Sequence, residues 1–509
     1  MKTSRTLLFI LAVFLLLGIS WFLFPADGIA VGQKSLHFPS YAQDKQGPEE
    51  VVDVDAVRES VNKSFEMSVS DNLLDSLDFY RDYLTVNPNR IHLPNNDYTY
   101  FDSLFYILER AQTDHKVYRV MHYGDSQIEM DRITSVLRQR LQEMFGGSGP
   151  GMICAVKRIF SISVNQSYSG NLVRYALVSD STSRKASHNR YGVLTQFCQT
   201  TGQTTVSFSK SNNSQAYDKA KEISRVSVLL GNNSDGFKAS LKAEDYQGEI
   251  KTCPAKAGAT MLTWELPKTV ERGSITFQGN AEIYGIMLDG GYGVAVDNDA
   301  LRGCSGTIFT RISKPLMKES FELTDTRLII LQFGGNRTPI IHNSNNISSY
   351  MRELDKQIKY FQEVAPQATL LFIGPADMGK SYNGKMGSYK CMNELNDSIK
   401  AMALSNNVAY WDMFHVMGGE GSMAQYVKHK PPLGSPDHIH FTFLGAQEMG
   451  GNLAKSIIIY HDFYQLRQRL SNDEMIKEFM NKDPELIEQE KEARKNKIEP
   501  TNYYINETH

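Results

Sequence analysis

A serine follows a Gly-Asp pair in the stretch RVMHYGDSQIEMDRIT, residues 119–134. The hydroxyl of Ser126 is a weak nucleophile, and it attacks an ester only if a neighbouring base removes its proton. The pattern predicts a strand over 116–124, a tight turn, and a helix over 127–147. At the start of that helix the backbone N–H of Ser126 could face an oxyanion. The alternative is that Asp125 or Ser126 only caps the helix.

An acid and a base lie three residues apart in SPDHIHFT, residues 435–442. On a single turn, the carboxylate of Asp437 can orient the imidazole of His440 and leave its second nitrogen to activate a serine. His438 is the rival base, but three-residue spacing fits one turn better than adjacency does. Two other interpretations stay open. One is a metal site of Asp437, His438 and His440, which lacks a second His/Asp cluster. The other is a polar loop in which Thr442 caps the next helix.

Asn336 follows the apolar run LIILQFGG, so the sequence predicts a side-chain amide at a strand end. Such a donor can stabilise the oxyanion of a tetrahedral intermediate. The residue could equally serve as a turn residue. Asn336-Arg337-Thr338 is also a glycosylation sequon. A glycan there would block a catalytic amide, so these two interpretations exclude each other.

The elements that would position these residues alternate between helix and strand. A helix over 97–115 precedes the strand that leads to Ser126. After residue 290 the alternation returns, with strands over 326–336, 368–377 and 408–414 and helices over 348–366, 392–407 and 442–466. Apolar strands that alternate with helices predict a parallel sheet covered on both faces. Ligands bind such sheets at the carboxyl ends of the strands, where Ser126 and Asn336 are placed.

Residues 155–289 interrupt this pattern. Short alternating segments such as TTVSFSKSNN and GSITFQGNAEIYGIMLDGG are separated by Gly, Asn and Ser turns. This pattern is typical of a β-sandwich. We therefore expect a separate domain inserted into the α/β unit.

The two ends of the chain differ from the middle. Lys2 and Arg5 precede the uncharged run LLFILAVFLLLGISWFLF, and about 18 to 20 apolar residues span a bilayer as a helix. Residues 1–30 therefore predict a signal anchor or a signal peptide, with the rest of the chain on the periplasmic or cell-surface side, membrane-anchored or secreted. Residues 31–96 read as a polar linker and a helical segment, and residues 467–509 as a charged helical tail.

Composition limits the classes of protein that need to be considered. The 509 residues suggest two or three globular units. The hydrophobic content of 41% and charged content of 22% are those of a folded globular protein. A net charge of −3 does not steer the chain to nucleic acid. The five cysteines show no CxxC spacing, so a zinc site of the usual kind is not expected, and they are too few for a disulfide scaffold.

Taken in order, these residues resemble the SGNH hydrolases, also called GDSL esterases. That family carries a Ser in a GDS turn, a Gly, an Asn in a GxN turn, and a DxxH motif before the last helix. The chain has GDS at Ser126, GGN at Asn336 and DHIH at Asp437 and His440, each at a predicted strand end. The resemblance implies a catalytic triad of Ser126, His440 and Asp437.

The remaining block of the family resembles ALRGCSGTIFTRI in this chain. It suggests Gly303, with Gly306 as the competitor. The resemblance then implies an oxyanion hole formed by the N–H groups of Ser126 and Gly303 and by the amide of Asn336. One departure is Arg337, which stands where the family often has Asp. It leaves the amide donor intact but changes the nearby charge, through either a substrate contact or a surface-facing side chain.

The resemblance also implies a fold. It is an α/β, flavodoxin-like parallel sheet, the SGNH hydrolase fold, built from residues 97–154 and 290–466 around the inserted β-sandwich. The reaction implied is acyl transfer through an acyl-enzyme, without a metal or an organic cofactor.

The substrate that the resemblance implies is an acylated carbohydrate or peptidoglycan, from which O-acetyl groups would be removed. The insert could help to hold a glycan through Tyr168, Tyr191 or Trp264, unless these rings pack in a core. Two alternatives remain open. One is an O-acetyltransferase that uses the same triad, and the other is a membrane-tethered glycan-binding protein without catalysis.

Overall fold

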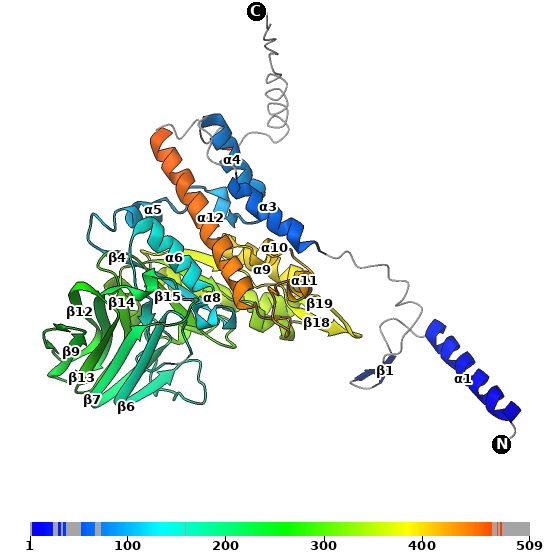
Figure 1. Ribbon diagram of the computed structural model, residues 1–509, viewed down its shortest axis with the longest axis horizontal. Helices are drawn as coiled ribbons and strands as arrows, with labels where there is room; N and C mark the ends of the chain where they lie inside the picture. The colour runs from blue at the N-terminus through cyan, green and yellow to red at the C-terminus, as the bar shows by residue number, and fades with distance from the viewer. Residues whose placement is uncertain are drawn as a thin grey trace, which may run out of the picture.

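The computed structural model describes residues 3–23, 29–31, 34–36, 52–66, 73–157, 159–470, 476 and 479–480. Two sheets dominate this part of the chain, one of six strands and one of ten (Figure 1). The ten-stranded sheet lies at one side of the helices that surround the six-stranded sheet. The predicted tail 467–509 lies outside the described residues beyond Leu470, apart from positions 476 and 479–480.

The six-stranded sheet has the strand order β15-β4-β16-β17-β20-β3. Its strands are β3 Ile91–His92, β4 Val117–Gly124, β15 Gly293–Ala300, β16 Thr326–Gln332, β17 Thr369–Ile373 and β20 Ala409–Trp411. All of them run parallel except β3, which pairs antiparallel with β20 at the edge. Counted along the chain from β4, the parallel strands have the order 2-1-3-4-5, which is that of flavodoxin-like folds. The predicted flavodoxin-like sheet is confirmed.

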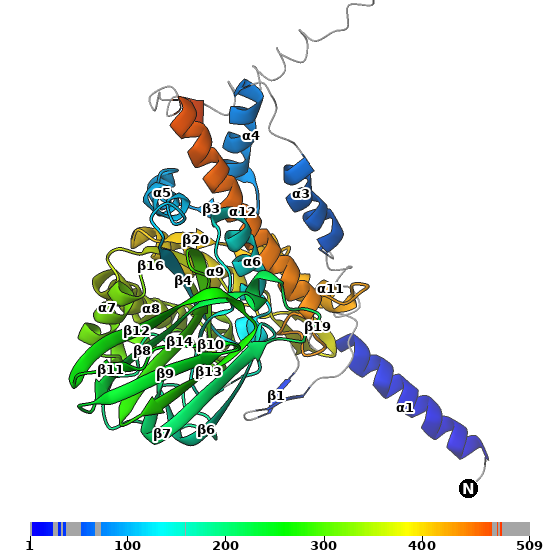
Figure 2. The ribbon, with the colours of Figure 1, turned by 60° about the vertical axis from the view of Figure 1, so that its left-hand side comes forward.

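Helices cover both faces of this sheet because successive strand residues point to opposite sides. Val120 and Ile330 belong to one hydrophobic layer, and their neighbours Met121 and Ile329 belong to the other. The first layer contains α6 Thr134–Phe145 and α12 Phe443–Leu470, and the second contains α7 Lys314–Leu323, α8 Ser344–Val364 and α9 Met392–Ser405 (Figure 2). Burial on both faces explains why these strands read as continuous apolar runs in the sequence.

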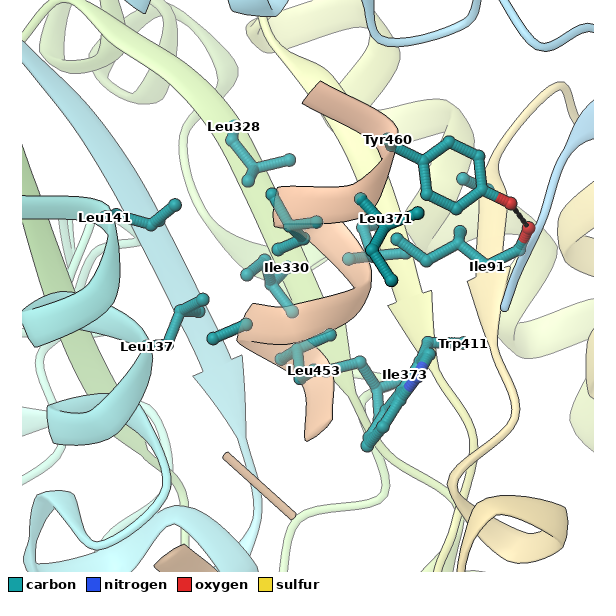
Figure 3. Close-up of a cluster of buried hydrophobic side chains, with 14 of the residues drawn as sticks. Ile91, Leu137, Leu141, Leu328, Ile330, Leu371, Ile373, Trp411, Leu453 and Tyr460 are labelled. Carbon is teal, nitrogen blue, oxygen red and sulfur yellow. Dashed lines mark hydrogen bonds between the residues drawn. The ribbon is translucent and has the colours of Figure 1, made fainter. Parts of the chain in front are cut away.

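Figure 3 shows the first of these layers. Leu137 of α6 and Leu453 of α12 lie against Ile330 of the sheet. Burial of one such side chain contributes roughly 1.5 to 3 kcal/mol. The hydroxyl of Tyr460 donates a hydrogen bond to the carbonyl of Ile91, which joins α12 to the edge strand β3. These contacts fix the helix that directly follows the DHIH turn.

The predicted insert forms the ten-stranded antiparallel sheet. Its strands are β5 Gly151–Ile153, β6 Val164–Ala176, β7 Gln196–Lys210, β8 Ile223–Asn233, β9 Phe237–Ala243, β10 Tyr246–Gln247, β11 Lys251–Cys253, β12 Lys256–Val270, β13 Arg272–Gln278 and β14 Ala281–Asp289. Strand β7 pairs with β14 through residues 198–200 and with β13 through residues 203–209. One long strand therefore links both halves into a single hydrogen-bonded sheet. The expected extra all-β unit is confirmed, and the two ends of its sheet meet, because the indole N–H of Trp264 on β12 donates to the carbonyl of Glu249 beside β10 at 3.0 Å.

A buried ion cluster joins the two sheets. The guanidinium of Arg119 on β4 lies 2.5 Å from the carboxylate of Asp289 on β14 and 2.7 Å from that of Asp297 on β15. All three side chains are almost fully buried. Removal of one partner from such a cluster leaves an uncompensated buried charge. The antiparallel unit is thus fixed to the strand that leads to Ser126.

The N-terminal part contains helices α1 Thr3–Leu23, α3 Val54–Glu66 and α4 Leu73–Val86. Among the residues that the structure describes, no helix is both long enough and apolar enough to cross a bilayer, so the predicted membrane segment is not supported. The ring of Tyr80 on α4 lies 5.2 Å from that of Phe463 on α12. Part of the segment 31–96, predicted as a linker and helical segment, therefore packs on the core.

The remaining helices and strands are shorter. They are β1 Ile29–Val31, β2 Lys34–Leu36, α5 Asp102–Glu109, β18 Gly379–Tyr382, β19 Lys385–Ser388, α10 Met413–Val416 and α11 Ser422–Lys428.

Candidate active site

A cavity of about 620 Å³ opens at the carboxyl ends of the parallel strands. This edge of the sheet is where ligands bind in open α/β folds. The cavity is lined by Asp125, Ser126, Gln127, Glu129, Arg132, Arg302, Gly303, Gln332, Phe333, Gly335, Asn336, Pro339, Pro375, Ala376, Met378, Met413, Ile439 and His440. These residues come from the chain after β4, β15, β16, β17 and β20, and from the DHIH turn.

The structure brings the predicted serine, histidine and aspartate together. Oγ of Ser126 lies 2.8 Å from Nε2 of His440, and Nδ1 of His440 lies 2.7 Å from Oδ2 of Asp437. The other carboxylate oxygen of Asp437 accepts hydrogen bonds from the backbone N–H groups of Ile439 and His440, at 2.9 and 3.0 Å. The three-residue spacing therefore does place the acid beneath the imidazole on one turn.

The electrostatics of this turn set the tautomer of the imidazole. Partial burial opposes ionisation of Asp437, but hydrogen bonds from His440 and from two backbone N–H groups outweigh it and lower the pKa of the carboxyl. An ionised carboxylate accepts the proton on Nδ1 of His440. Nε2 is then free to accept the proton of the Ser126 hydroxyl, which is the arrangement that general-base catalysis requires.

The turn that carries Ser126 differs from the one predicted. Residues 126–131 form a 3₁₀ helix, η2 Ser126–Asp131, and the α-helix predicted from residue 127 begins only at Thr134. Glu129 and Met130 have non-helical backbone angles. The side chain of Asp125 caps this short helix by accepting a hydrogen bond from the N–H of Gln127 at 2.9 Å. One turn therefore both caps the short helix through Asp125 and places the Ser126 hydroxyl against the imidazole of His440.

Two side chains join the serine turn to the histidine turn. The guanidinium of Arg132 donates to the carbonyl of Ser126 at 2.6 Å, to that of Gln127 at 3.1 Å and to that of Phe441 at 3.1 Å. The amide of Gln127 donates to the carbonyl of Ile439 at 2.7 Å. These bonds bracket His440 on both sides. Sequence analysis did not predict them, because the acceptors are backbone carbonyls that carry no side-chain signal.

Asn336 lies in the cavity as predicted, at the start of the 3₁₀ helix η5 Gly335–Ile340. Its amide nitrogen donates to Oδ2 of Asp125 at 3.1 Å and to the carbonyl of Cys304 at 3.2 Å. Both amide protons thus have protein acceptors. An oxyanion would share one of these protons or displace one acceptor. Burial raises the pKa of Asp125 to about 6, against the effect of its hydrogen bonds, so this acceptor changes charge near neutral pH.

Of the two candidate glycines, Gly303 faces the cavity. It has a φ of +74°, and the space where a Cβ would stand is empty. Gly306 instead packs on Phe333, whose ring atoms lie 2.6 Å from the position of a Cβ. Within the described part of the chain, no protein group accepts a hydrogen bond from the backbone N–H of Ser126 or Gly303. Both N–H groups are available to a ligand.

Thr442 caps α12 as the third interpretation of the DHIH turn predicted, because its Oγ1 accepts a hydrogen bond from the N–H of Gly445 at 3.2 Å, and this cap coexists with the histidine contact to Ser126. The rival base and the metal site find less support in the geometry. The backbone carbonyl of His438 accepts a hydrogen bond from the N–H of Gly379 at 2.7 Å, and its Cβ packs on that glycine. Among the described residues, no three His, Cys, Asp or Glu side chains are placed to share a metal ion. His440 lies against Ser126, whereas His438 contacts Gly379 at the start of β18.

The rim of the cavity carries an ion pair. Arg302 donates through Nε and Nη2 to the two carboxylate oxygens of Glu129, each at 2.6 Å. The Arg302 side chain is 70% exposed and that of Glu129 is 8% exposed. Arg337 lies outside the cavity lining, with its guanidinium 5.5 Å from the ring centre of Tyr350. Arg302, which was not singled out from the sequence, is therefore an exposed cation in the cavity lining.

The aromatic residues proposed to hold a glycan divide into two groups. Tyr191 and Trp264 are buried in hydrophobic cores, so the packing interpretation holds for both. Tyr168 on β6 is 48% exposed. Of the three rings, only that of Tyr168 is open to a ligand.

Comparison with known proteins gives similarity in structure. No protein-family model matches the chain, and no curated protein matches it by sequence. A solved structure of a peptidoglycan O-acetylesterase is similar over 71% of this chain and 96% of its own, with a TM-score of 0.57 and 18% identity. This similarity shows a shared fold, and it confirms the resemblance to SGNH hydrolases at that level.

Two further solved structures match less closely. A putative GDSL-like lipase from Parabacteroides merdae is matched over 33% of this chain and 74% of its own, with 15% identity and a TM-score of 0.24. A family two carbohydrate esterase from Cellvibrio japonicus is matched over 59% and 99%, with 9% identity and a TM-score of 0.23.

Proposed function

We propose that this protein is a serine esterase that removes O-acetyl groups from a carbohydrate or peptidoglycan through an acyl-enzyme. The observation that carries the proposal is the continuous relay from Ser126 through His440 to Asp437, with distances of 2.8 and 2.7 Å. Such a relay converts a weak hydroxyl into a nucleophile. It lies in a cavity of about 620 Å³, within the size range of small-ligand sites.

The reaction follows from these positions. Oγ of Ser126 attacks the carbonyl carbon of the ester while its proton passes to Nε2 of His440. The tetrahedral intermediate collapses, His440 gives the proton to the leaving sugar oxygen, and the acetyl group stays on Ser126. A water molecule then attacks the acyl-enzyme, its proton passes through His440 back to Ser126, and acetate leaves. Asp437 stabilises the imidazolium at both stages.

The negative charge of each tetrahedral intermediate needs donors. Ser126 and Gly303 line the cavity, and the N–H group of each has no protein acceptor in the described chain. The amide of Asn336 would join them after it releases Asp125 or the carbonyl of Cys304. Donors fixed in this way stabilise the transition state more than the substrate.

The substrate class rests on two supports. The fold is shared with a peptidoglycan O-acetylesterase over most of both chains. The cavity is open to one side and has a polar rim at Arg302 and Glu129, which suits a hydrophilic alcohol portion. An acetyltransferase that uses the same three residues differs only in the acceptor, so the products decide between the two reactions.

An extracytoplasmic location is part of the same proposal and rests on the sequence alone. Lys2 and Arg5 precede the uncharged apolar run described above, the arrangement of a segment that directs export. Fractionation of cells that express the full chain tests it. Recovery of the protein in the cytoplasmic fraction alone would overturn this part of the proposal.

The decisive assay follows acetate release from O-acetylated peptidoglycan and acetylated xylan, for the wild type beside Ser126→Ala. We expect acetate release from the wild type and none above background from the variant. A fluorophosphonate probe should label the wild type and not Ser126→Ala. Equal labelling of both proteins would overturn the assignment of Ser126, and labelling without acetate release would overturn the substrate class.

A further inference from the structure

A small hairpin stands beside the candidate active site. Among the described strands, β18 and β19 pair only with each other, from Gly379↔Ser388 to Tyr382↔Lys385. Asn383 and Gly384 form the turn, with φ values of 51° and 84°, as expected of a type I′ hairpin turn. Figures 1 and 2 show the hairpin beside α11, separate from both large sheets. An isolated pair of strands gains little stability of its own, so this feature adds little to the core.

The base of the hairpin is fixed to the histidine turn. Met378, directly before β18, lines the catalytic cavity. The N–H of Gly379 donates to the carbonyl of His438 at 2.7 Å. A Cβ at position 379 would lie 2.7 Å from Cβ of His438, so only glycine allows this approach. At the other end, the hydroxyl of Ser388 accepts a hydrogen bond from the N–H of Gly421 at 2.7 Å. The hairpin therefore has a set position relative to His440.

The hairpin is basic although the chain as a whole is slightly acidic. The segment MGKSYNGKMGSYKC, residues 378–391, has three lysines and no acidic residue, whereas the net charge of the chain is −3. Lys380, Lys385 and Lys390 are all exposed. No carboxylate among the described residues forms an ion pair with any of them. Within that part of the chain, no ion pair neutralises their charges.

Two tyrosines lie among these lysines. Nζ of Lys380 is 5.6 Å from the ring centre of Tyr382 and 5.3 Å from that of Tyr389. Nζ of Lys390 is 5.9 Å from the ring of Tyr382. Both rings are partly exposed. Lysines alone on a hairpin can serve to prevent edge-to-edge association, but that role requires neither the rings nor the fixed base at the active site.

We propose that the β18–β19 hairpin binds an anionic glycan strand and holds it across the mouth of the catalytic cavity. The lysines would contact carboxylates of the strand and the tyrosines would stack on its sugar rings. The proposal rests on the esterase function above and narrows its substrate class to acidic polymers. Small neutral esters would reach Ser126 without the hairpin.

The test compares a hairpin variant with a matched control. The hairpin variant carries Lys380→Gln, Lys385→Gln and Lys390→Gln. The control carries Lys238→Gln, Lys242→Gln and Lys318→Gln, at exposed lysines of β9 and α7. Both variants lose the same charge, so they separate a local effect from an effect of net charge.

Each protein is assayed on O-acetylated peptidoglycan fragments, which carry carboxylates, on acetylated xylan, and on para-nitrophenyl acetate. For the hairpin variant we expect about a tenfold loss of kcat/KM on peptidoglycan, mostly through KM, because three surface charge contacts are lost. That loss should shrink as salt is added. Activity on para-nitrophenyl acetate should stay within about twofold, and the control should behave as the wild type.

A binding measurement keeps this proposal separate from the esterase function. Full-length Ser126→Ala, with and without the three hairpin substitutions, is titrated with carboxymethyl cellulose and with neutral hydroxyethyl cellulose. We expect only the protein with intact lysines to bind the anionic polymer more tightly than the neutral one. Equal binding by both proteins, or an equal loss in the control triple, would overturn the hairpin site. A wild type that hydrolyses none of the esters would overturn the proposed function. The titration would still show whether the hairpin lysines bind an anionic polymer.

Discussion

Two Asp-x-x-His turns in this molecule have nearly the same local geometry. In one, Nδ1 of His440 lies 2.7 Å from Asp437 and the N–H of His440 bonds to the same carboxylate at 3.0 Å. In the other, Nδ1 of His415 lies 2.8 Å from Asp412 and the N–H of His415 bonds to that carboxylate at 3.2 Å. Both turns lie near the carboxyl ends of parallel strands. Only one of them lies against a serine.

The difference is in what surrounds each pair. Nε2 of His440 meets Oγ of Ser126, which comes from a different strand. Asp412 instead caps α10 and accepts bonds from Asn396 of α9 at 3.0 Å and from Lys400 at 3.4 Å. Its side chain is 2% exposed, whereas that of Asp437 is 46% exposed. One pair anchors helices and the other serves a cavity.

The comparison shows how far a local motif determines a role. Three-residue spacing is enough to place a carboxylate under an imidazole, because both groups belong to one turn. It does not determine whether a third group meets the free nitrogen. That depends on the register and order of distant strands, here β4 and the loop before α12.

The largest expected difference between the two turns is in catalysis. His440→Ala removes the base that faces Ser126, so kcat for acetate release should fall by about 10³-fold or more. His415→Ala removes an imidazole with the same local geometry and should leave kcat within about twofold. Steady-state kinetics on acetylated xylan measure both. Similar losses in the two variants would break the distinction drawn above.

The two aspartates should separate catalysis from stability. Asp437→Asn leaves His440 without its ionised partner, and kcat should fall by roughly 10²- to 10³-fold with little change in unfolding. Asp412→Asn loses a buried, hydrogen-bonded carboxylate and should lower the free energy of unfolding by about 2 kcal/mol while the folded enzyme keeps its kcat. Urea unfolding and initial rates are measured on the same samples. A loss of stability in Asp437→Asn together with a loss of kcat in Asp412→Asn would contradict these roles.

Arg132 should have an intermediate effect because it acts through backbone carbonyls on both sides of the serine–histidine pair. Arg132→Met removes its three hydrogen bonds and should lower kcat by roughly ten- to a hundredfold with a smaller change in KM. Arg132→Lys should recover part of the rate. Arg140→Met on the exposed side of α6 is the control. A change in KM alone would show that Arg132 contacts substrate instead of positioning the turns.

The smallest expected effect is the pH dependence of the stability that the His415–Asp412 hydrogen bond contributes. The hydrogen bond to Asp412 raises the pKa of His415 above its ordinary value, against partial burial. A raised folded-state pKa gives stability that is complete below about pH 6.5 and is lost as pH rises through the folded pKa. Because the ring is half exposed, His415→Asn should cost at most about 1 kcal/mol near pH 5.5 and less at pH 8.5. Urea unfolding at both pH values measures this, and a larger cost at the higher pH would contradict it.

Much of the fold could be predicted from the sequence because burial leaves a strong pattern. The runs around Ile330 and Leu371 predict strands buried on both faces, and both lie in the central sheet. The all-β character of the insert was equally clear from alternation. The pairing of its strands was not, because the pairing of β7 with both β13 and β14 depends on contacts distant in sequence.

The candidate site was predicted to the level of residue types at strand ends. Ser126, His440 and Asp437 meet as expected, since the order of the four sequence blocks carries information on topology. The helix start after Ser126 was wrong, because Glu129 and Met130 leave the helical region and Arg132 bonds to backbone carbonyls. Backbone acceptors have no residue signature, so neither that break nor the link through Gln127 was predicted.

The most direct test of the central claim is the rate and position of covalent capture. The second-order rate constant for fluorophosphonate labelling is measured for the wild type, His440→Ala and His415→Ala, and the modified residue is found by peptide mapping. We predict an adduct on Ser126 at the same rate in the wild type and His415→Ala, and about a hundredfold slower labelling in His440→Ala. An adduct on another residue, or equal rates in all three proteins, would contradict the account.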